Sequence, residues 1–157
     1  MIAKNVRVKL DESYKNLLHL LSSGRTIYGV NTGFGRLSQI KIKDSDQSKL
    51  QLNLVRSHSA GVGKNLDSGI VRIIMILKVL NYSHGFSGVH PDTVKKLAQF
   101  INNDIIPMVP AKGSVGASGD LAQLAHIASS IIGEGKVLQN GRELHSKAAL
   151  KKLKISP

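Results

Sequence analysis

The residues best suited to unusual chemistry are the eight from Gly113 to Asp120, GSVGASGD, of which six are glycine, alanine or serine. Such small side chains let the backbone fold tightly on itself. At the centre of the run, the Gly119 nitrogen can attack the Ala117 carbonyl, because glycine has no Cβ to block the approach. Loss of the Ser118 hydroxyl as water then leaves an exocyclic methylene on a five-membered ring. Ordinary side chains are not electrophiles, so this group would do work that otherwise needs a bound cofactor.

A helix is expected directly after this run, over residues 120–132. Asp120 is suited to cap that helix or to occupy its first turn. The positive end of the helix dipole would then stabilise negative charge arriving on the ring, which favours an electrophile. The prediction of a helix rests on apolar residues that recur at helical spacing: Leu121, Leu124, Ala125, Ala128, Ile131 and Ile132.

The tripeptide Ala-Ser-Gly alone is common, and most examples are loops or helix caps. The longer run GSVGASGDLAQLAHIA, however, resembles the signature of the aromatic amino acid ammonia-lyases, the family of histidine and phenylalanine ammonia-lyases. Residues 28–35 (YGVNTGFG) and 56–63 (RSHSAGVG) resemble two further segments of that family. The resemblance covers essentially the whole chain, but only the N-terminal portion of a full family member. It implies the family's cofactor, 4-methylidene-imidazole-5-one (MIO), formed from Ala117, Ser118 and Gly119.

By this resemblance Tyr28 is the catalytic acid or base, in a loop that Gly33 and Gly35 support. A phenol acts as a base only where nearby positive charge or hydrogen-bond donors stabilise the phenolate. The residues alone leave open that Tyr28 only packs beside a glycine-rich loop. They likewise leave open that His58 is structural, whereas the resemblance places His58 against the substrate side chain.

Within the resemblance, Ser57-His58-Ser59-Ala60-Gly61 favours the histidine-specific members of the family, which implies L-histidine as the substrate. The chemistry is compatible, since a neutral imidazole can donate to or accept from another imidazole. The implied activity is that of a carbon–nitrogen lyase: the substrate amine adds to the methylene, a base takes a β-proton, and ammonia and urocanate leave. A phenylalanine or tyrosine ammonia-lyase, or an aminomutase, is the alternative within the family.

The resemblance also implies a homotetramer whose sites combine residues from several subunits. Further site residues of the family would lie beyond Pro157. We therefore expect residues 1–157 to be a single partial domain, the MIO-bearing N-terminal region, with little or no activity alone and with incomplete or absent ring closure.

The composition bounds the other function classes. The 157 residues carry a net charge of +12 and no cysteine, which excludes disulfides and zinc–thiolate sites and is compatible with the cytoplasm. Neither a signal peptide nor a membrane span is evident. A positive charge of this size is also typical of proteins that bind nucleic acid. A non-enzymatic basic binding fragment is therefore the remaining alternative. Scattered lysines and 4% aromatic residues disfavour nucleic acid as a partner.

The expected fold is mainly α: a helical domain with short extended segments and one small β-hairpin. The hairpin spans residues 136–144 around Asn140-Gly141. Extended segments are expected over 26–30 and 105–112, and a broadly apolar helix, buried on several sides, over 67–82. Four histidines have no metal-ligand spacing and are expected at the surface or at helix ends: His84, His90, His126 and His145. The other expected helices are 11–23 (ended by Gly24), 46–60 (capped by Ser45), 91–102 and 146–155 (capped by Ser146).

Overall fold

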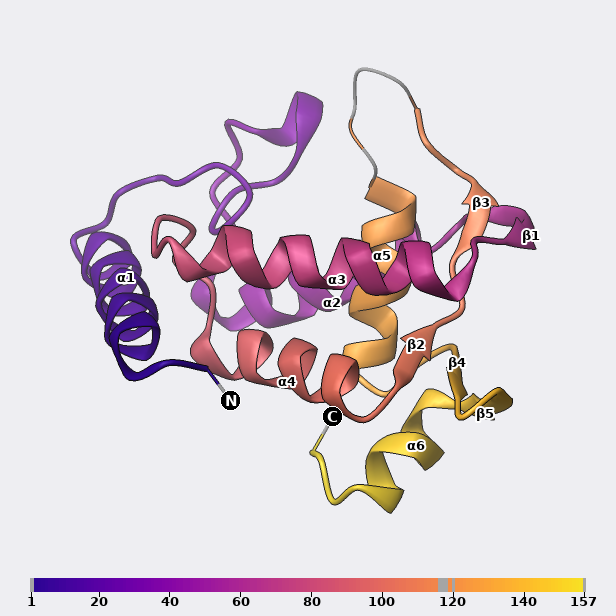
Figure 1. Cartoon of the computed structure of the whole chain (residues 1–157). Coiled ribbons are helices and arrows are strands. Elements are labelled where there is room, and N and C mark those ends of the chain that lie inside the picture. Colours follow the sequence, from indigo (N-terminus) through magenta and orange to yellow (C-terminus); the bar gives the residue numbers. More distant parts are fainter. Residues whose placement is uncertain (1, 116–118, 120, 157) are drawn as a thin grey trace.

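The computed structural model describes residues 2–115, 119 and 121–156 and is mainly helical (Figure 1). The elements in chain order are α1 (Lys4–Ser22), the 3-10 turn η1 (Gly35–Leu37), α2 (Asp44–His58), β1 (Val62–Asn65), α3 (Ser68–Ser83), α4 (Pro91–Asn102), β2 (Ile105–Pro107), β3 (Pro110–Lys112), α5 (Leu121–Ile131), β4 (Lys136–Gln139), β5 (Arg142–His145) and α6 (Ser146–Lys152). The predicted mainly helical fold is confirmed.

One apolar core joins the middle of the chain to its C-terminal part. Phe100 of α4 and Met75 of α3 are fully buried in it, and burial of large apolar side chains is the main force that holds such elements together. The same cluster takes residues from β2, α5, β4 and α6: Ile105, Ile106, Ile127, Ile131, Val137, Ala149 and Leu150. This core fixes α5, which begins at Leu121, directly after the run over residues 113–120 in the sequence.

The predicted hairpin is confirmed as β4 and β5, with Asn140 and Gly141 both at positive φ in the turn. The structure adds strands that the predicted single hairpin lacks. β2 pairs antiparallel with β4 to make a three-stranded sheet, and β1 pairs antiparallel with β3. The predicted extended segment 105–112 is thus two short strands that belong to different sheets.

Several predicted boundaries are confirmed and others are wrong. The helix over 91–102 has the predicted bounds, and its N-cap is His90, whose Nδ1 accepts from the Asp92 N–H. Residues 28–30 form a turn, so the extended segment predicted over 26–30 is wrong. Helix α1 begins at Lys4, well before the predicted residue 11. Buried Leu10 explains the longer α1, because it gives the helix an apolar contact among charged neighbours.

Two predicted caps are also wrong. Helix α2 starts one residue before Ser45, and its N-cap residue, Lys43, makes no side-chain cap bond. At α6 the cap is His145, whose Nδ1 accepts from the Lys147 N–H, while the buried Ser146 hydroxyl donates to the Ser130 carbonyl at 2.6 Å. Ser146 therefore ties α6 to α5 instead of capping it.

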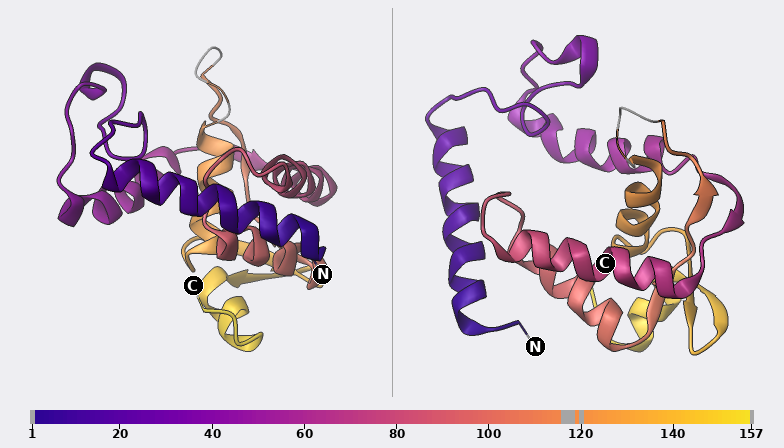
Figure 2. Two further views of the ribbon diagram at one scale, coloured as in Figure 1. Left: turned by 90° about the vertical axis from the view of Figure 1, so that its left-hand side faces the viewer. Right: turned by 45° about the horizontal axis from the view of Figure 1, so that its top comes forward.

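Helix α3 is not buried on several sides as predicted. Its buried residues are Val71 and Met75, whereas Ile73, Leu77 and Leu80 are each more than half exposed. Figure 2 shows α1 at one side of the molecule, next to α3 and α4. The three apolar side chains stay exposed despite that contact. The helix is apolar on more faces than this chain covers.

Candidate active site

The loop over residues 28–35 is shaped by two buried polar side chains, Asn31 and Thr32. The Asn31 amide donates to the Arg25 carbonyl at 2.8 Å, and its oxygen accepts from the Ile27 N–H at 2.7 Å. The Thr32 hydroxyl donates to the Gly33 carbonyl at 2.8 Å. Buried polar groups that find partners in this way give a loop one defined conformation.

The two supporting glycines of this loop are needed for different reasons. A Cβ on Gly33 would lie 2.6 Å from the Cβ of Leu37, so the backbone approaches closer there than any other residue allows. Gly35 instead has a φ of +55°, in the left-handed region that glycine adopts without strain. The side-chain amide of Gln51 ties the loop to α2 by donating to the Gly29 carbonyl at 3.0 Å.

Tyr28 lies at the start of this loop with 63% of its surface exposed. The Gly35 N–H donates to its phenolic oxygen at 3.4 Å, and the edge of its ring packs against Phe34 with the centroids 5.9 Å apart. The phenol oxygen therefore accepts from the backbone, and its own proton is free to be donated to another molecule.

His58 is the last residue of α2 and is half-buried. Its Nδ1 lies 2.9 Å from the Leu54 carbonyl and 3.1 Å from the Ser57 hydroxyl. A carbonyl can only accept, so Nδ1 carries the proton, and Nε2 is the acceptor of the neutral ring. The helix thus orients the imidazole through its own backbone.

Tyr28, Gly35 and His58 line one pocket of about 730 Å³. The other side of this pocket is the apolar face of α5, beginning at Leu121 in its first turn, and Lys78 and Tyr82 of α3 close a third side. The Lys78 ammonium lies 4.8 Å from the centre of the Tyr82 ring, within the range of a cation–π contact. The pocket therefore joins an apolar wall to a phenol, an imidazole and an ammonium group.

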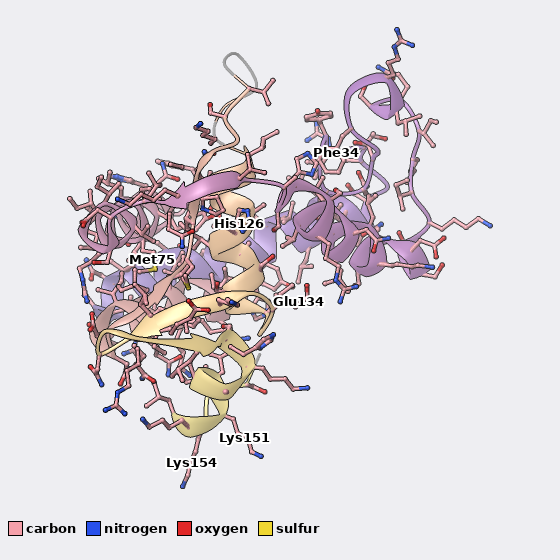
Figure 3. All side chains as sticks on the ribbon, turned by 90° about the vertical axis from the view of Figure 1, so that its right-hand side faces the viewer. Phe34, Met75, His126, Glu134, Lys151 and Lys154 are labelled. Carbon is pink, nitrogen blue, oxygen red and sulfur yellow. The ribbon has the colours of Figure 1, made fainter. Side chains whose placement is uncertain are left out.

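Among the described residues, three polar contacts tie the end of α2 to α5 and the turn after it, in antiparallel order. Arg56 forms an ion pair with Glu134, the Ser59 hydroxyl lies 2.8 Å from the Ser129 hydroxyl, and the Gly61 N–H donates to Nε2 of His126 at 3.1 Å. Figure 3 shows His126 on α5 and Glu134 at the turn beyond its C-terminal end. The segment that carries His58 is therefore held along the length of α5.

The segment before α5 starts at a close crossing of two backbones. A Cβ on Gly113 would lie 2.8 Å from the Ala122 Cβ and 3.2 Å from the Gly61 Cα. Near its end, Gly119 has a φ of +74°, again in the left-handed region, and is exposed. Ala117, Ser118 and Asp120 lie outside the described residues, so the predicted ring and the predicted cap at Asp120 stay predictions.

The structure thus brings Tyr28, His58 and Gly35 together and places Gly33 in the supporting backbone. Among the described residues, no three histidine or carboxylate side chains are placed to hold a metal ion. None of the helices within the described ranges has the length and hydropathy to cross a bilayer.

The whole chain, residues 1–157, matches the family model for aromatic amino acid lyases. The chain belongs to the aromatic amino acid lyase family. Among relatives, it is 47% identical over 156 residues to the probable histidine ammonia-lyase of Thermoplasma volcanium, an alignment that covers 99% of this chain and 32% of the relative. It is 49% identical over 138 residues to the histidine ammonia-lyase of Salmonella typhi, covering 88% of this chain and 27% of the relative.

The fold of this aromatic amino acid lyase chain is similar to a solved aminomutase. It superposes on the phenylalanine aminomutase of Pantoea agglomerans with a TM-score of 0.94 at 34% identity, over 100% of this chain and 30% of that one. The chain spans about a third or less of the length of the curated relatives it matches.

Sequence reasoning missed His126, which it expected at the surface or at a helix end. The ring is half-buried inside α5 and accepts a hydrogen bond from a residue 65 positions away. Burial lowers its pKa from the ordinary value, because desolvation disfavours the charged ring. The available signal was the helical spacing, since His126 follows buried Ala122 by four residues and so lies on the same helix face.

Proposed function

We propose that this chain carries the electrophile-forming and substrate-facing part of an ammonia-lyase that converts L-histidine to urocanate and ammonia. The observation that carries the proposal is that Tyr28 and His58 line one pocket whose opposite wall begins at the first turn of α5. Two curated relatives described as a histidine ammonia-lyase or a probable one, at 49% and 47% identity, support histidine as the substrate.

In this proposal His58 recognises the substrate imidazole. Its protonated Nδ1 is held by the Leu54 carbonyl, so Nε2 can accept the N–H of a neutral substrate ring. Apolar residues of α2 and α5 line the pocket around it, and an apolar surrounding strengthens that hydrogen bond.

In this proposal Tyr28 is the acid or base that transfers the β-proton of the substrate. Its oxygen already accepts from the Gly35 N–H, and this contact holds the phenol at the pocket that it lines. A large part of the ring is exposed, so the phenol can reach a molecule bound in the pocket. General acid–base help of this kind contributes about 10²- to 10⁴-fold to a rate.

The residues present fit the family's MIO group. Gly119 has the positive φ and the open surroundings that a residue without a Cβ provides, and the Gly113 crossing fixes the start of the loop. Bound in the backbone of residues 117–119, the group would supply an electrophile for the substrate amine. The N-terminus of α5 follows directly and favours negative charge there.

We include in the proposal a homotetramer, a cytoplasmic location and the need for segments beyond residue 157. The last point follows from the two-thirds of the relatives' length that this chain does not match. Measurable urocanate from the purified chain alone would contradict it.

An aminomutase that acts on phenylalanine or tyrosine is the second candidate, favoured by the fit to the solved phenylalanine aminomutase. The imidazole of His58, facing the apolar wall of the pocket, argues for histidine over these substrates.

The test is a chimera that joins residues 1–157 to the downstream part of the Salmonella typhi relative. We expect it to form urocanate from L-histidine, with no β-amino acid from phenylalanine or tyrosine. Ser118→Ala should abolish both the loss of two waters from the 113–135 peptide and the activity. Tyr28→Phe should lower kcat by about 10²- to 10⁴-fold.

Substrate recognition is tested by His58→Leu, which should lower kcat/KM for L-histidine by about tenfold or more. His84→Gln, on an exposed ring outside the pocket, is the matched control and should behave as the parent chimera. Turnover of phenylalanine or tyrosine in preference to histidine would overturn the substrate assignment.

A further inference from the structure

Three chain segments approach one another closely beside the candidate site. Gly61 follows α2, Gly113 begins the run before α5, and Ala122 lies in the first turn of α5. A Cβ on Gly61 would lie 3.0 Å from Nε2 of His126 and 3.1 Å from the Pro110 Cβ, and a Cβ on Gly113 would touch both other segments. The separation of these segments is therefore set by backbone contact and by one ring.

That ring is His126, and its hydrogen bond has a defined direction. A backbone N–H can only donate, so Nε2 of His126 must be the unprotonated acceptor for Gly61, and the proton of the neutral ring is on Nδ1. Half-burial of the ring stabilises the neutral form over the charged one. A protonated imidazole would have no acceptor to offer at this position.

The bond lies at a particular place along α5. Of the three ties between the end of α2 and α5, Arg56–Glu134 is beyond the C-terminal end of α5, and Ser59–Ser129 is in its last turns. The His126 bond is nearest to the first turn and to Gly113. It is therefore the tie that acts on the distance between the His58 segment and Gly113.

We propose that neutral His126 is a positioning residue: it holds the backbone at Gly61 against the start of α5 and so sets where the His58 segment lies relative to Gly113, the first residue of the loop over 113–120. This inference rests on the proposed function in assigning that loop to the electrophile, but the hydrogen bond itself can be tested independently.

The first experiment uses the 157-residue chain and nuclear magnetic resonance. Long-range nitrogen spectra of the histidine rings should show His126 with its proton on Nδ1 at neutral pH. Hydrogen exchange of the Gly61 amide should be slow in the parent chain. A proton on Nε2, or a Gly61 amide that exchanges at the rate of an unstructured peptide, would overturn the proposal.

Variants separate positioning from mere packing. The side-chain amide of His126→Gln can place an oxygen near the position of Nε2, whereas the shorter His126→Asn cannot. We expect exchange of the Gly61 amide to be about tenfold faster in His126→Asn, as for the loss of one hydrogen bond, and restored by His126→Gln. His84→Gln is the matched control and should leave the rate unchanged. Equal rates in the Asn and Gln variants would contradict the inference.

A chemical measurement on the chimera links the bond to the loop. The fraction of the 113–135 peptide that has lost two waters should fall in His126→Asn and recover in His126→Gln. An unchanged fraction in His126→Asn would refute the positioning role toward the loop. Absence of water loss in every protein, the parent included, would instead refute the proposed function, and the Gly61 exchange rates would still decide whether the hydrogen bond exists.

Discussion

Arg56 and Glu134, 78 residues apart in the sequence, form a two-point ion pair in which Nε of Arg56 lies 3.0 Å and 3.1 Å from the two carboxylate oxygens. Hydrogen bonds from Arg56 lower the pKa of Glu134 below its ordinary 4.5. The folded chain therefore binds fewer protons here than the unfolded chain, so the contribution of the pair is present above pH 4.5 and is lost as the pH falls through the lowered pKa.

Replacement by Glu134→Gln should remove that pH dependence and lower the free energy of unfolding only slightly, because the pair is exposed. Urea unfolding at neutral and acidic pH measures both effects. High salt should shrink the difference between the parent and the variant. A difference that persists unchanged in high salt would show that the pair acts through packing instead of charge.

A second pH effect is expected from His126. Burial holds its folded pKa below the ordinary 6.5, so the unfolded chain takes up a proton at a pH where the folded chain does not. The free energy of unfolding should therefore be fully retained above pH 6.5 and decline as the pH falls from there toward the lowered pKa. Urea titrations across this range should show a steeper decline in the parent than in His126→Gln; identical slopes would show that the ring does not contribute.

The crossing at Gly113 predicts a steric penalty. Gly113→Ala should destabilise the fold by about 1–3 kcal/mol, the usual cost of overpacking, because the new Cβ meets the Ala122 Cβ and the Gly61 Cα. Ser114→Ala, at the exposed neighbouring residue, is the control. Thermal unfolding followed by circular dichroism compares them, and equal midpoints would mean that the two backbones are farther apart than described.

Two phenylalanines provide a matched test of the core. Phe100 is fully buried, so Phe100→Ala should cost about 3–5 kcal/mol of unfolding free energy. Phe86, in the turn between α3 and α4, is 93% exposed, and Phe86→Ala should change stability by about 0.5 kcal/mol at most. Chemical unfolding of both variants tests the placement of the core, which would be wrong if the two costs were similar.

The exposed apolar face of α3 predicts self-association. Replacing Ile73, Leu77 and Leu80 with glutamine should reduce oligomer formation in sedimentation velocity, since large exposed apolar patches drive association. An equal number of exposed lysines on α6 changed to glutamine is the control: Lys147, Lys151 and Lys152. If this control lowers association as much as the α3 variant does, charge and not the apolar face is responsible.

Local patterns predicted the helical elements because each carries its own signal. Pro91 marks the first residue of α4, Gly24 follows the end of α1, and Asn140-Gly141 makes the hairpin turn. Such signals depend on a few neighbouring residues, so they can be read without knowledge of the fold. The predicted site roles of Tyr28 and His58 came instead from family resemblance.

Pairings between distant segments were not predictable in the same way. The β1–β3 ladder and the Gly61–His126 bond each join residues far apart in sequence. Neither pairing produces a periodic pattern in the sequence of the segments that it joins. The exposure of α3 was also missed, because an all-apolar helix indicates burial without saying what covers it. These features depend on tertiary packing, which overrides local propensity.

The pocket is lined by two of the chain's intrinsic fluorophores. The chain contains no tryptophan and three tyrosines, and two of these, Tyr28 and Tyr82, line the pocket. Intrinsic ultraviolet emission of this chain therefore comes mainly from phenol rings at the proposed substrate position, with Tyr14 as the remaining source. Quenching of that emission on titration with a small molecule would report occupancy of the pocket without any attached dye.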